Sequence, residues 1–417
     1  MSNSNTIEHN KDELNPPDFL NKEFFEKILR DSEKDEHLQI TKLDILPGSN
    51  PGDHFGSVMF KAVVTYSSKE NENSTKSLVV KLAPVEEGLK MEFLQDLPIF
   101  DREIQVYTKI LSEMKKIMES IEDDEELAPR LLYYSTKPQL LVLEDVRKFG
   151  YGMHYKFFDF DNTVKILKKL AKFHALSYYM NDNKYVYKTD LTAFKTIIDK
   201  AILEKMNILY EGFDYLSEEV KNWPGFDGIA AKLATQKESF IGKLLDTYQP
   251  NPEPGFNVLC HGDFHLKNMM FIKHGGEIQK TMFLDFQTCF WGSPAIDLIY
   301  ILYGIGGTEC RARRGEILSI YHKTLSDYLK RLGCMRKPPT VLDLNIEMLK
   351  MGTIELLWSV CYLQFYALDF TKISFEDIFN PSPEVLSKMR KTVYTNEEIV
   401  KVLKEVLPEL YYKGILA

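Results

Sequence analysis

The chain has 417 residues, 44% of them hydrophobic and 27% charged, with a formal net charge of -9 at pH 7. These values are typical of a folded globular protein long enough for two lobes, each with its own core. The acidic balance disfavours a nucleic-acid surface, which needs clustered basic residues. We therefore expect no nucleic-acid partner.

The N-terminal 15 residues are rich in Asn, Ser, Glu and Lys, and this composition predicts disorder over residues 1–15. The segment lacks the apolar stretch of a secretory signal, and no window approaches the roughly 18 apolar residues of a membrane span. The five cysteines are an odd number at irregular spacing, in neither a metal nor a disulfide pattern. We expect no membrane partner and a cytoplasmic location.

The first elements after this segment are an amphipathic helix over residues 19–29 and then a run of strands. Alternating apolar residues predict strands over 38–46, 57–66 and 77–83, with Val58, Phe60, Ala62, Val64 and Tyr66 on one face of the second. The spacing of the strands predicts three antiparallel strands.

The loop between the first two strands, residues 47–56, contains Gly48, Gly52 and Gly56. Glycines let backbone amides approach phosphate groups closely, so this loop is a candidate lid over a nucleotide, with Gly52 and Gly56 as contact residues. An ordinary hairpin loop is the alternative.

Lys81 lies in an otherwise apolar strand, where an unpaired ammonium would be costly. The helix predicted over residues 91–119 supplies Glu103 as a partner, with Glu92 and Asp101 as nearby competitors. A strand lysine paired with a helix glutamate is the arrangement that positions nucleotide phosphates in kinases. The alternative is a lysine that extends to solvent from an edge strand.

Residues 130–135 and 140–143 read as a strand pair around the turn at Lys137-Pro138, after an acidic run at 122–126 that we expect to be a solvated loop. The pair ends at Glu144 and Val146, where the chain would pass between lobes. Backbone groups of these two residues are candidates for binding an adenine edge, with Leu141 and Leu143 against the ring. An ordinary strand between lobes is equally compatible.

Beyond Gly150 the pattern becomes helical. Apolar spacing predicts a helix over 163–179, with His174 packed in the core, and further helices over 190–250. Later segments read as structural: Asp297 as support for a neighbouring loop, Arg311 to Arg314 as a solvated helix face, and 354–370 as an aromatic core helix around Trp358.

The most informative stretch is His261-Gly-Asp-Phe-His-Leu-Lys-Asn268, followed by Leu284-Asp-Phe-Gln287. Each part follows an apolar run that reads as a strand, and we expect the two strands to pair as a hairpin. Phosphoryl transfer needs a carboxylate to orient or deprotonate the attacking hydroxyl, and oxygen ligands for Mg²⁺. Asp263 suits the first role and Asn268 and Asp285 the second, while Lys267 would neutralise the phosphate.

A zinc site at His261 and His265 is the competing interpretation of this stretch. Gly262 and the preceding strand argue against a helix that presents both imidazoles on one face, and no second Cys/His pair is nearby. We expect His261 to bond the loop backbone, and His265 to have a packing or solvent position.

Several motifs together resemble the ecdysteroid kinase-like family, which is related to choline kinases and aminoglycoside phosphotransferases. The resemblance spans most of the chain and rests on these motifs: Phe100-x-x-Glu103-x-x-x-Tyr107, Leu143-Glu-Asp-Val146, Leu170-Ala-Lys-Phe-His-Ala-Leu-Ser177, His261-Gly-Asp-Phe-His-Leu-Lys-Asn268 and Leu284-Asp-Phe-Gln287.

The resemblance implies an α+β, two-lobed protein-kinase-like fold. Its small antiparallel β lobe with one main helix would span residues 16–145, and its larger, mostly helical lobe 146–417. It implies ATP and Mg²⁺ as cofactors, Asp263 as base, Asn268 and Asp285 as metal ligands, and a Lys81–Glu103 pair at the phosphates. The loop at 47–56 lacks the tight Gly-x-Gly spacing of protein kinases. Only eleven residues separate Asp285 from Asp297, too few for a protein-substrate platform.

The expected activity is therefore transfer of phosphate to a hydroxyl of a small molecule, with an ecdysteroid or other lipophilic alcohol or xenobiotic favoured by the resemblance. A choline-, ethanolamine- or aminoglycoside-type kinase is the alternative within the enzyme class. A catalytically silent protein that binds a small ligand is the alternative outside it, and the presence of Lys81, Asp263, Asn268 and Asp285 argues against it. The oligomeric state stays open.

Overall fold

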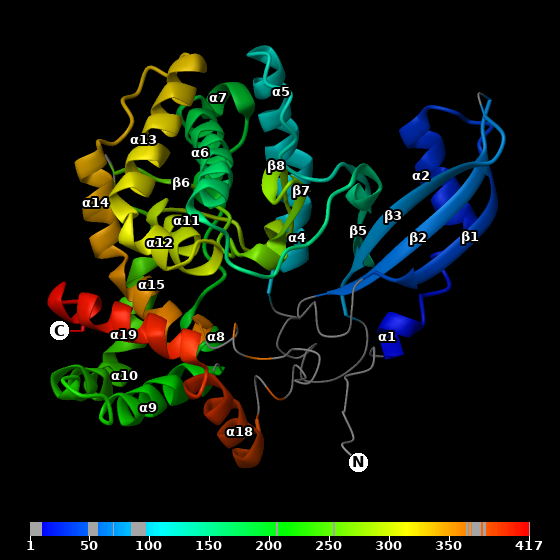
Figure 1. The fold of residues 1–417 in the computed structure, drawn as a ribbon. Helices are drawn as coiled ribbons and strands as arrows, with labels where there is room; N and C mark the ends of the chain where they lie inside the picture. Colours follow the sequence, from blue (N-terminus) through cyan, green and yellow to red (C-terminus); the bar gives the residue numbers. More distant parts are fainter. Residues whose placement is uncertain are drawn as a thin grey trace.

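The computed structural model describes residues 11–48, 57–69, 71–84, 97–205, 207–252, 255–363, 366, 368, 377 and 381–416. An antiparallel β-sheet with one covering helix lies at one end of the molecule, and a larger assembly of helices lies at the other (Figure 1). The predicted α+β class, with a small β lobe and a mostly helical lobe, is thus confirmed. We keep residues 16–145 and 146–417 as the proposed extents of the two lobes.

The sheet has the strand order β1-β2-β3-β5-β4, and all its neighbours are antiparallel. Its strands are β1 (Gln39–Pro47), β2 (Val58–Ser67), β3 (Ser74–Leu82), β4 (Leu131–Thr136) and β5 (Gln139–Glu144). Every strand that the hydrophobic pattern predicts is present, and β3 begins three residues before the predicted start.

Side-chain alternation gives the sheet two different faces. Phe60 on β2 and Val80 on β3 pack under helix α2 (Lys22–Glu33), whose Phe25 and Leu29 are fully buried. Lys81, one residue beyond Val80, therefore points to the opposite face, away from α2. The predicted alternation of β2 is confirmed, because its even-numbered residues from Val58 to Val64 are buried.

The helix beside the opposite face of the sheet is built in three parts. Helix α4 (Ile99–Gln105) continues into a π-helical turn, Val106–Leu111, and then into α5 (Ser112–Ser120). The predicted helix over 91–119 ends one residue later than expected, and its first residues, 91–96, lie outside the described part of the chain.

After β5 the chain makes a short 3-10 turn, Val146–Phe149, and leaves it through Gly150, whose φ of 92° is a conformation that glycine adopts readily. Helix α6 (Phe160–Asp182) then crosses the second lobe and packs along α13 (Arg314–Arg331). Both are long helices at the centre of the helical region in Figure 1. His174 of α6 is fully buried, as predicted.

The strands of the catalytic-type motif pair differently from the prediction. Strand β6 (Val258–Cys260) pairs with β9 (Phe290–Gly292), whereas β7 (Met269–His274) forms a hairpin with β8 (Glu277–Phe283). The expected hairpin between the first apolar run and the strand before Asp285 is therefore wrong. The segment 269–274 is itself a strand and is joined to β8 by a tight turn at Gly275 and Gly276, both at positive φ.

The remaining helices complete the second lobe, apart from α1, which packs against β1 and β2. Their bounds are α1 (Lys11–Leu14), α7 (Lys184–Tyr187), α8 (Lys200–Lys205), α9 (Asn207–Val220), α10 (Asp227–Thr247), α11 (Ala295–Tyr300), α12 (Thr308–Ala312), α14 (Val341–Lys350), α15 (Gly352–Leu357), α18 (Pro383–Tyr394) and α19 (Glu397–Tyr412), with π-helical turns at Ile301–Ile305 and Trp358–Tyr362. Helix α1 lies inside the segment predicted to be disordered, and residues 1–10 lie outside the described part. No described helix has the length and apolar character that crossing a membrane requires.

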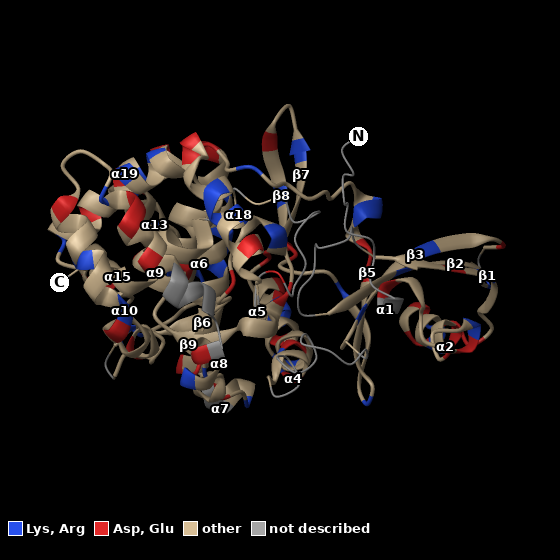
Figure 2. Cartoon of the chain, turned by 90° about the horizontal axis from the view of Figure 1, so that it is seen from below, with Lys and Arg blue, Asp and Glu red and all other residues tan. Residues whose placement is uncertain are grey.

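Charged residues are spread over the helices and strands (Figure 2), and in two charged segments that we expected to be solvated, Asp123 and Arg314 are packed instead against partners far away in the sequence. In the acidic run, Asp123 accepts hydrogen bonds from Lys172 Nζ at 3.0 Å and from the Tyr328 hydroxyl at 2.9 Å. In the arginine cluster, Arg314 forms a two-pronged ion pair with the buried Glu355, at 2.7 and 2.9 Å. Burial of one partner makes each pair part of the core.

Candidate active site

A cleft of about 340 Å³ lies between the sheet and the helical lobe. Both lobes contribute to its walls. Strands β1, β2, β3 and β5 and helix α4 with its π-helical turn lie on one side, and β7, the residues just before it and the residues just after β8 lie on the other. Its lining residues are Pro47, Gly48, Met59, Val79, Lys81, Glu103, Tyr107, Pro129, Leu143, Glu144, Asp145, Val146, Arg147, Met153, Tyr155, Lys267, Asn268, Met270, Leu284 and Asp285.

Lys81 joins two carboxylates inside this cleft. Its Nζ lies 2.6 Å from Glu103 Oε2 and 2.8 Å from Asp285 Oδ1, and both Lys81 and Glu103 are buried. The structure therefore brings Lys81 and Glu103 together, as predicted. Of the competing partners, Asp101 is exposed and accepts instead from Gln139 Nε2 at 3.1 Å, and Glu92 lies outside the described residues.

The charges in this cluster shift one another's pKa. Burial alone would lower the pKa of Lys81, but the Asp285 and Glu103 carboxylates raise it above its ordinary value. Burial raises the pKa of Glu103 to about 7; Lys81 opposes the rise and Asp285 adds to it. The cluster holds two acidic groups against one ammonium, so a further cation would be electrostatically favourable there.

Asp285 has a left-handed backbone conformation, with φ of 61°, which is uncommon for a residue other than glycine. Both main-chain polar groups of the preceding residue are held: Leu284 N–H donates to Asn268 O at 2.9 Å, and Leu284 O lies 2.9 Å from His261 Nε2. Residues held in such conformations cluster at functional sites, because the surrounding structure must enforce them. His261 bonds the loop backbone, as predicted.

The loop after β6 holds Asp263 beside Asn268. The Asn268 amide donates through Nδ2 to Asp263 Oδ2 at 3.0 Å and to Asp263 O at 2.9 Å. The Asp263 side chain is one-third exposed, so a molecule from solvent can reach it. Asn268 lines the cleft, and the carboxylate that it positions lies next to the cleft.

His265, in the same loop, contacts Asp263, and the sequence analysis did not predict this contact. We expected a packing or solvent position, but its Nε2 lies 3.2 Å from Asp263 Oδ1. Burial alone would raise the pKa of Asp263, yet His265 and Asn268 lower it. Burial likewise opposes the rise in the pKa of His265, which Asp263 nevertheless raises. A two-residue spacing of Asp and His was the only signal in the sequence.

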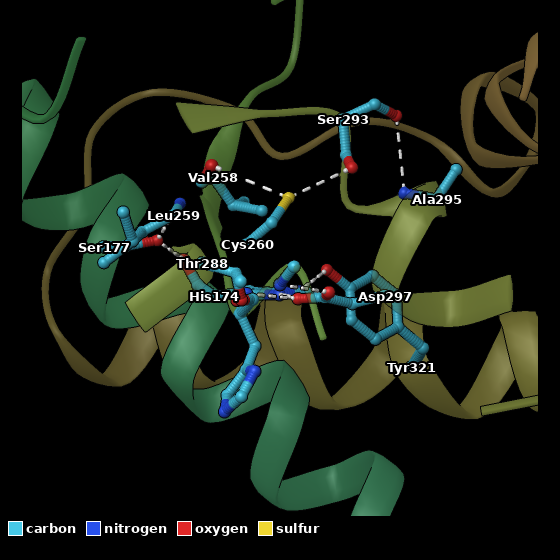
Figure 3. Close-up of polar contacts among 12 residues, drawn as sticks. His174, Ser177, Val258, Leu259, Cys260, Thr288, Ser293, Ala295, Asp297 and Tyr321 are labelled. Carbon is cyan, nitrogen blue, oxygen red and sulfur yellow. Dashed lines mark hydrogen bonds and ion pairs between the residues drawn. The ribbon is translucent and has the colours of Figure 1, made fainter. Parts of the chain in front are cut away.

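The Asp297 side chain holds the backbone at the start of the loop that carries Asp263 (Figure 3). Its carboxylate accepts from the backbone N–H of His261 at 2.7 Å and of Gly262 at 3.0 Å, and its Oδ2 lies 3.0 Å from His174 Nε2. The Tyr321 hydroxyl lies 2.9 Å from the other nitrogen of His174. These three fully buried side chains, His174, Asp297 and Tyr321, fix the backbone of the two residues before Asp263, which confirms the predicted supporting role of Asp297.

The segment between the lobes forms one end of the cleft. Glu144 and Val146 both line it, and so does Leu143, whereas Leu141 is fully buried and does not. The expectation for Leu141 is therefore wrong: it lies on the same face of β5 as Leu143, but it is fully buried in the hydrophobic core and does not reach the cleft.

A second missed feature lies beside this segment. Asp145 accepts from Ser77 Oγ at 2.6 Å and from Arg147 Nε at 2.7 Å, and Arg147 Nη1 donates to Gly48 O at 3.4 Å. Gly48 lines the cleft, whereas the predicted contact residues Gly52 and Gly56 lie outside the described part of the chain.

The oxygen donors at the cleft fit a hard cation such as Mg²⁺. The Asp285 carboxylate and the Asn268 amide are such donors, and Lys267 lines the same cleft. Among the described residues, no three His, Cys, Asp or Glu side chains gather as a ready-made metal site. A cation here would therefore draw ligands from water or from phosphate oxygens, which is usual for Mg²⁺.

The chain shares low sequence identity with several solved structures. It is 12% identical to the GDP complex of wild-type aminoglycoside 2'-phosphotransferase-IIIa, with 91% of this chain and 99% of that chain covered and a TM-score of 0.43. It is 10% identical to choline kinase from Cryptosporidium parvum Iowa II, with coverages of 94% and 100% and a TM-score of 0.42. Choline kinase from Streptococcus pneumoniae is 12% identical, with coverages of 88% and 99% and a TM-score of 0.33.

A search of curated proteins finds no significant match. A model of the ecdysteroid kinase-like family, by contrast, matches residues 51–334. The match covers more than half of the chain and includes the Lys81–Glu103 pair, the loop from His261 to Asn268 and Asp285. The chain therefore belongs to the ecdysteroid kinase-like family.

Proposed function

We propose that this protein is an ATP- and Mg²⁺-dependent phosphotransferase that phosphorylates a hydroxyl of a small molecule. The observation that carries the proposal is the Lys81–Glu103–Asp285 cluster, which shares one cleft with Asn268 and lies beside Asp263. This combination supplies a cation for phosphate oxygens, oxygen donors for a metal, and a carboxylate that solvent can reach. Membership in the family supports the same reading.

The proposed roles follow from the chemistry of each side chain. Asp263 accepts the proton of the attacking hydroxyl, and its lowered pKa keeps it ionised at neutral pH. Lys81, held by Glu103, binds phosphate oxygens, and Lys267 lies in the same cleft to balance their charge. Asn268 and Asp285 are the proposed metal ligands; Mg²⁺, when bound, would neutralise charge that develops on the phosphates.

The segment between the lobes is the proposed place of the adenine ring. Glu144 and Val146 would offer backbone groups to its edge, with Leu143 and Val79 as apolar contacts. We also retain Gly52 and Gly56 as proposed phosphate contacts.

For the acceptor we propose an ecdysteroid or another lipophilic alcohol or xenobiotic. Aromatic side chains gather near Asp263: burial raises the pKa of Tyr248, Tyr300, Tyr362 and Tyr366, and the negative charge of Asp263 raises each further. Trp358 packs edge to face on Tyr300 and on Tyr362, with ring centroids 5.0 and 5.2 Å apart, and Tyr362 and Tyr366 are partly exposed. Such surfaces favour a large apolar ligand.

A cationic acceptor is the second candidate. The same aromatic rings would also suit a quaternary ammonium group, which binds over aromatic faces. A choline-type kinase is therefore the rival that the experiment must separate.

The test is transfer of labelled γ-phosphate from Mg-ATP to a panel of ecdysteroids, choline and ethanolamine, aminoglycosides and simple phenols. We expect a phosphorylated product with a lipophilic alcohol. Asp263→Asn should lower turnover by about 10²- to 10⁴-fold, the usual contribution of a general base.

Product from choline or an aminoglycoside alone would replace the proposed acceptor. ATP binding with no acceptor phosphorylated would exclude the tested classes. Failure to bind ATP would favour the silent ligand-binding protein over an enzyme.

The remaining proposals concern the cellular location of the protein and its partners. All five cysteines are free, which suits a reducing compartment, and we propose a cytoplasmic location. The proposed partner is the small-molecule substrate, without nucleic acid or membrane.

A further inference from the structure

Tyr107 has a buried hydroxyl that lacks a hydrogen-bond partner within the described part of the chain. Its side chain lines the cleft, and the residue is only 6% exposed. Among the described residues, no group lies in hydrogen-bonding position to its hydroxyl oxygen. Buried hydroxyl groups in proteins are almost always hydrogen-bonded, so this exception needs an explanation.

Tyr107 lies beside the charged cluster. It follows Glu103 by four residues, which places both on one side of the helix as it enters the π-helical turn. Its ring packs edge to face on Phe286, with centroids 5.6 Å apart, directly after Asp285. Burial raises the pKa of Tyr107 well above its ordinary value, and the nearby Glu103 and Asp285 carboxylates raise it further. The phenol therefore stays protonated and can donate.

Neither of the two nearby carboxylates accepts a hydrogen bond from the Tyr107 hydroxyl. Glu103 and Asp285 each accept from Lys81, at 2.6 and 2.8 Å. A phenylalanine would fill the same space without an unsatisfied hydroxyl, which is unfavourable when buried. The hydroxyl is thus a donor in the cleft wall for an acceptor that the described chain does not supply.

We propose that the Tyr107 hydroxyl donates a hydrogen bond to an oxygen that enters the cleft with the Mg-nucleotide. This inference rests on the proposed function. A non-bridging phosphate oxygen has the required chemistry. It is a strong acceptor, in a cleft where Lys81 already contacts anionic carboxylate oxygens.

The experiment uses Tyr107→Phe, which removes only the hydroxyl, and Tyr394→Phe as its matched control. Tyr394 also has a buried hydroxyl without a partner among the described residues, but it lies on α18 beside Tyr215 and does not line the cleft. ATP is titrated into wild type and both variants by calorimetry, with Mg²⁺ and with EDTA. The Tm of each protein is measured without ligand.

We expect Tyr107→Phe to raise Kd for Mg-ATP about 5- to 10-fold, the loss of one hydrogen bond, and Tyr394→Phe to leave it unchanged. Without ligand, both variants should melt no lower than wild type, and about 1–2 °C higher where relief of the unsatisfied hydroxyl is complete. Weaker binding in both metal conditions would identify a phosphate oxygen as the acceptor. Weaker binding only with Mg²⁺ would overturn the inference, because a metal-bound water donates hydrogen bonds and the hydroxyl would then be its acceptor.

An unchanged Kd for Tyr107→Phe overturns the inference. A lower Tm for Tyr107→Phe without ligand also overturns it, because the hydroxyl would then already have a permanent partner. If wild type itself binds no ATP in either condition, the proposed function fails and this inference fails with it.

Discussion

Two lysines are buried in the described part of this protein, and their surroundings differ. Lys81, 5% exposed, lies in the cleft between two carboxylates on different elements. Lys169, 3% exposed, lies in α6, where it donates to the main-chain carbonyls of Glu126 and Thr281 and lies 3.3 Å from Glu125. Their pKa values move in opposite directions: that of Lys81 is raised, and burial lowers that of Lys169 to about 8.

The difference separates a lysine of the candidate active site, Lys81, from a lysine with a structural role, Lys169. The acceptors of Lys169 are main-chain carbonyls whose positions are fixed by the fold. Its hydrogen bonds therefore hold the acidic run against α6, and a ligand could not take their place. Carboxylates outnumber the ammonium around Lys81, and both line the cleft, so a ligand can exchange contacts with them. Burial of a charge alone therefore does not identify a functional residue; the access and charge of its partners do.

Of the substitutions that test this comparison, Lys81→Met should have the largest effect. Phosphate transfer should fall on the order of 10²- to 10³-fold, as for loss of one donor to a transition-state oxygen. Glu103 would also remain buried beside Asp285 without a cation, which typically costs about 3–5 kcal/mol. A carboxyl with a raised pKa contributes stability below its unfolded value of 4.5 and loses it as pH rises through its folded pKa. Urea unfolding at pH 5 and 8 should show the deficit growing with pH.

Turnover within tenfold of wild type would contradict this role of Lys81. A deficit that does not change between pH 5 and 8 would contradict the charge argument for Glu103.

A smaller effect, confined to stability, is expected from Lys169→Met. Loss of the donor leaves the carbonyls of Glu126 and Thr281 without it, at a cost of about 1–3 kcal/mol at pH 7. The pKa of Lys169 is depressed from 10.5 to about 8, so wild type gains stability as pH rises from 8 to 10.5, by about 3 kcal/mol. The variant lacks this gain, and the difference between the two unfolding curves should widen above pH 8.

Normal nucleotide affinity in this variant is the control. Weakened Mg-ATP binding by Lys169→Met, measured in the same buffer, would show that the two lysines are not functionally separate.

The smallest effect is expected from a substitution at His265, within the candidate active site. His265→Gln removes an imidazole 3.2 Å from Asp263, in a pair that is about one-third exposed. We expect kcat to fall about tenfold with KM for ATP unchanged, because the contact orients the base and not the nucleotide. Steady-state kinetics at saturating acceptor check this. An equal rise in KM with no change in kcat would place His265 in substrate binding instead.

Local patterns predicted the fold well. The alternation in β2 and the apolar positions of α2 gave both elements with small shifts at their ends. Pairing between strands was less accessible: the strand before Asp285 pairs with β7, because a two-glycine turn at Gly275 and Gly276 joins them. Strand partners depend on chain reversals that an apolar run does not encode.

The candidate site was predictable where spacing carries the chemistry. Lys81 and Glu103 meet as expected, and Asn268 lies against Asp263, whereas the contact of Lys81 with Asp285 was not predicted. The contact of His265 with Asp263 depends on the turn of one loop. Tyr107 belongs to a motif found in the sequence, Phe100-x-x-Glu103-x-x-x-Tyr107. That its hydroxyl lacks a partner among the described residues can be known only from the structure around it. The ion pair between Arg314 and Glu355 joins residues that no local pattern connects.

The most direct test of the account is a paired measurement on Asp263→Asn. Calorimetry gives its Kd for Mg-ATP, and rapid-quench single-turnover kinetics with the identified acceptor give its rate of phosphate transfer. The account predicts wild-type affinity together with a rate about 10²- to 10⁴-fold lower, because Asp263 serves the acceptor hydroxyl and not the nucleotide. A wild-type rate, or a loss of affinity that accounts for the whole loss of rate, would contradict it.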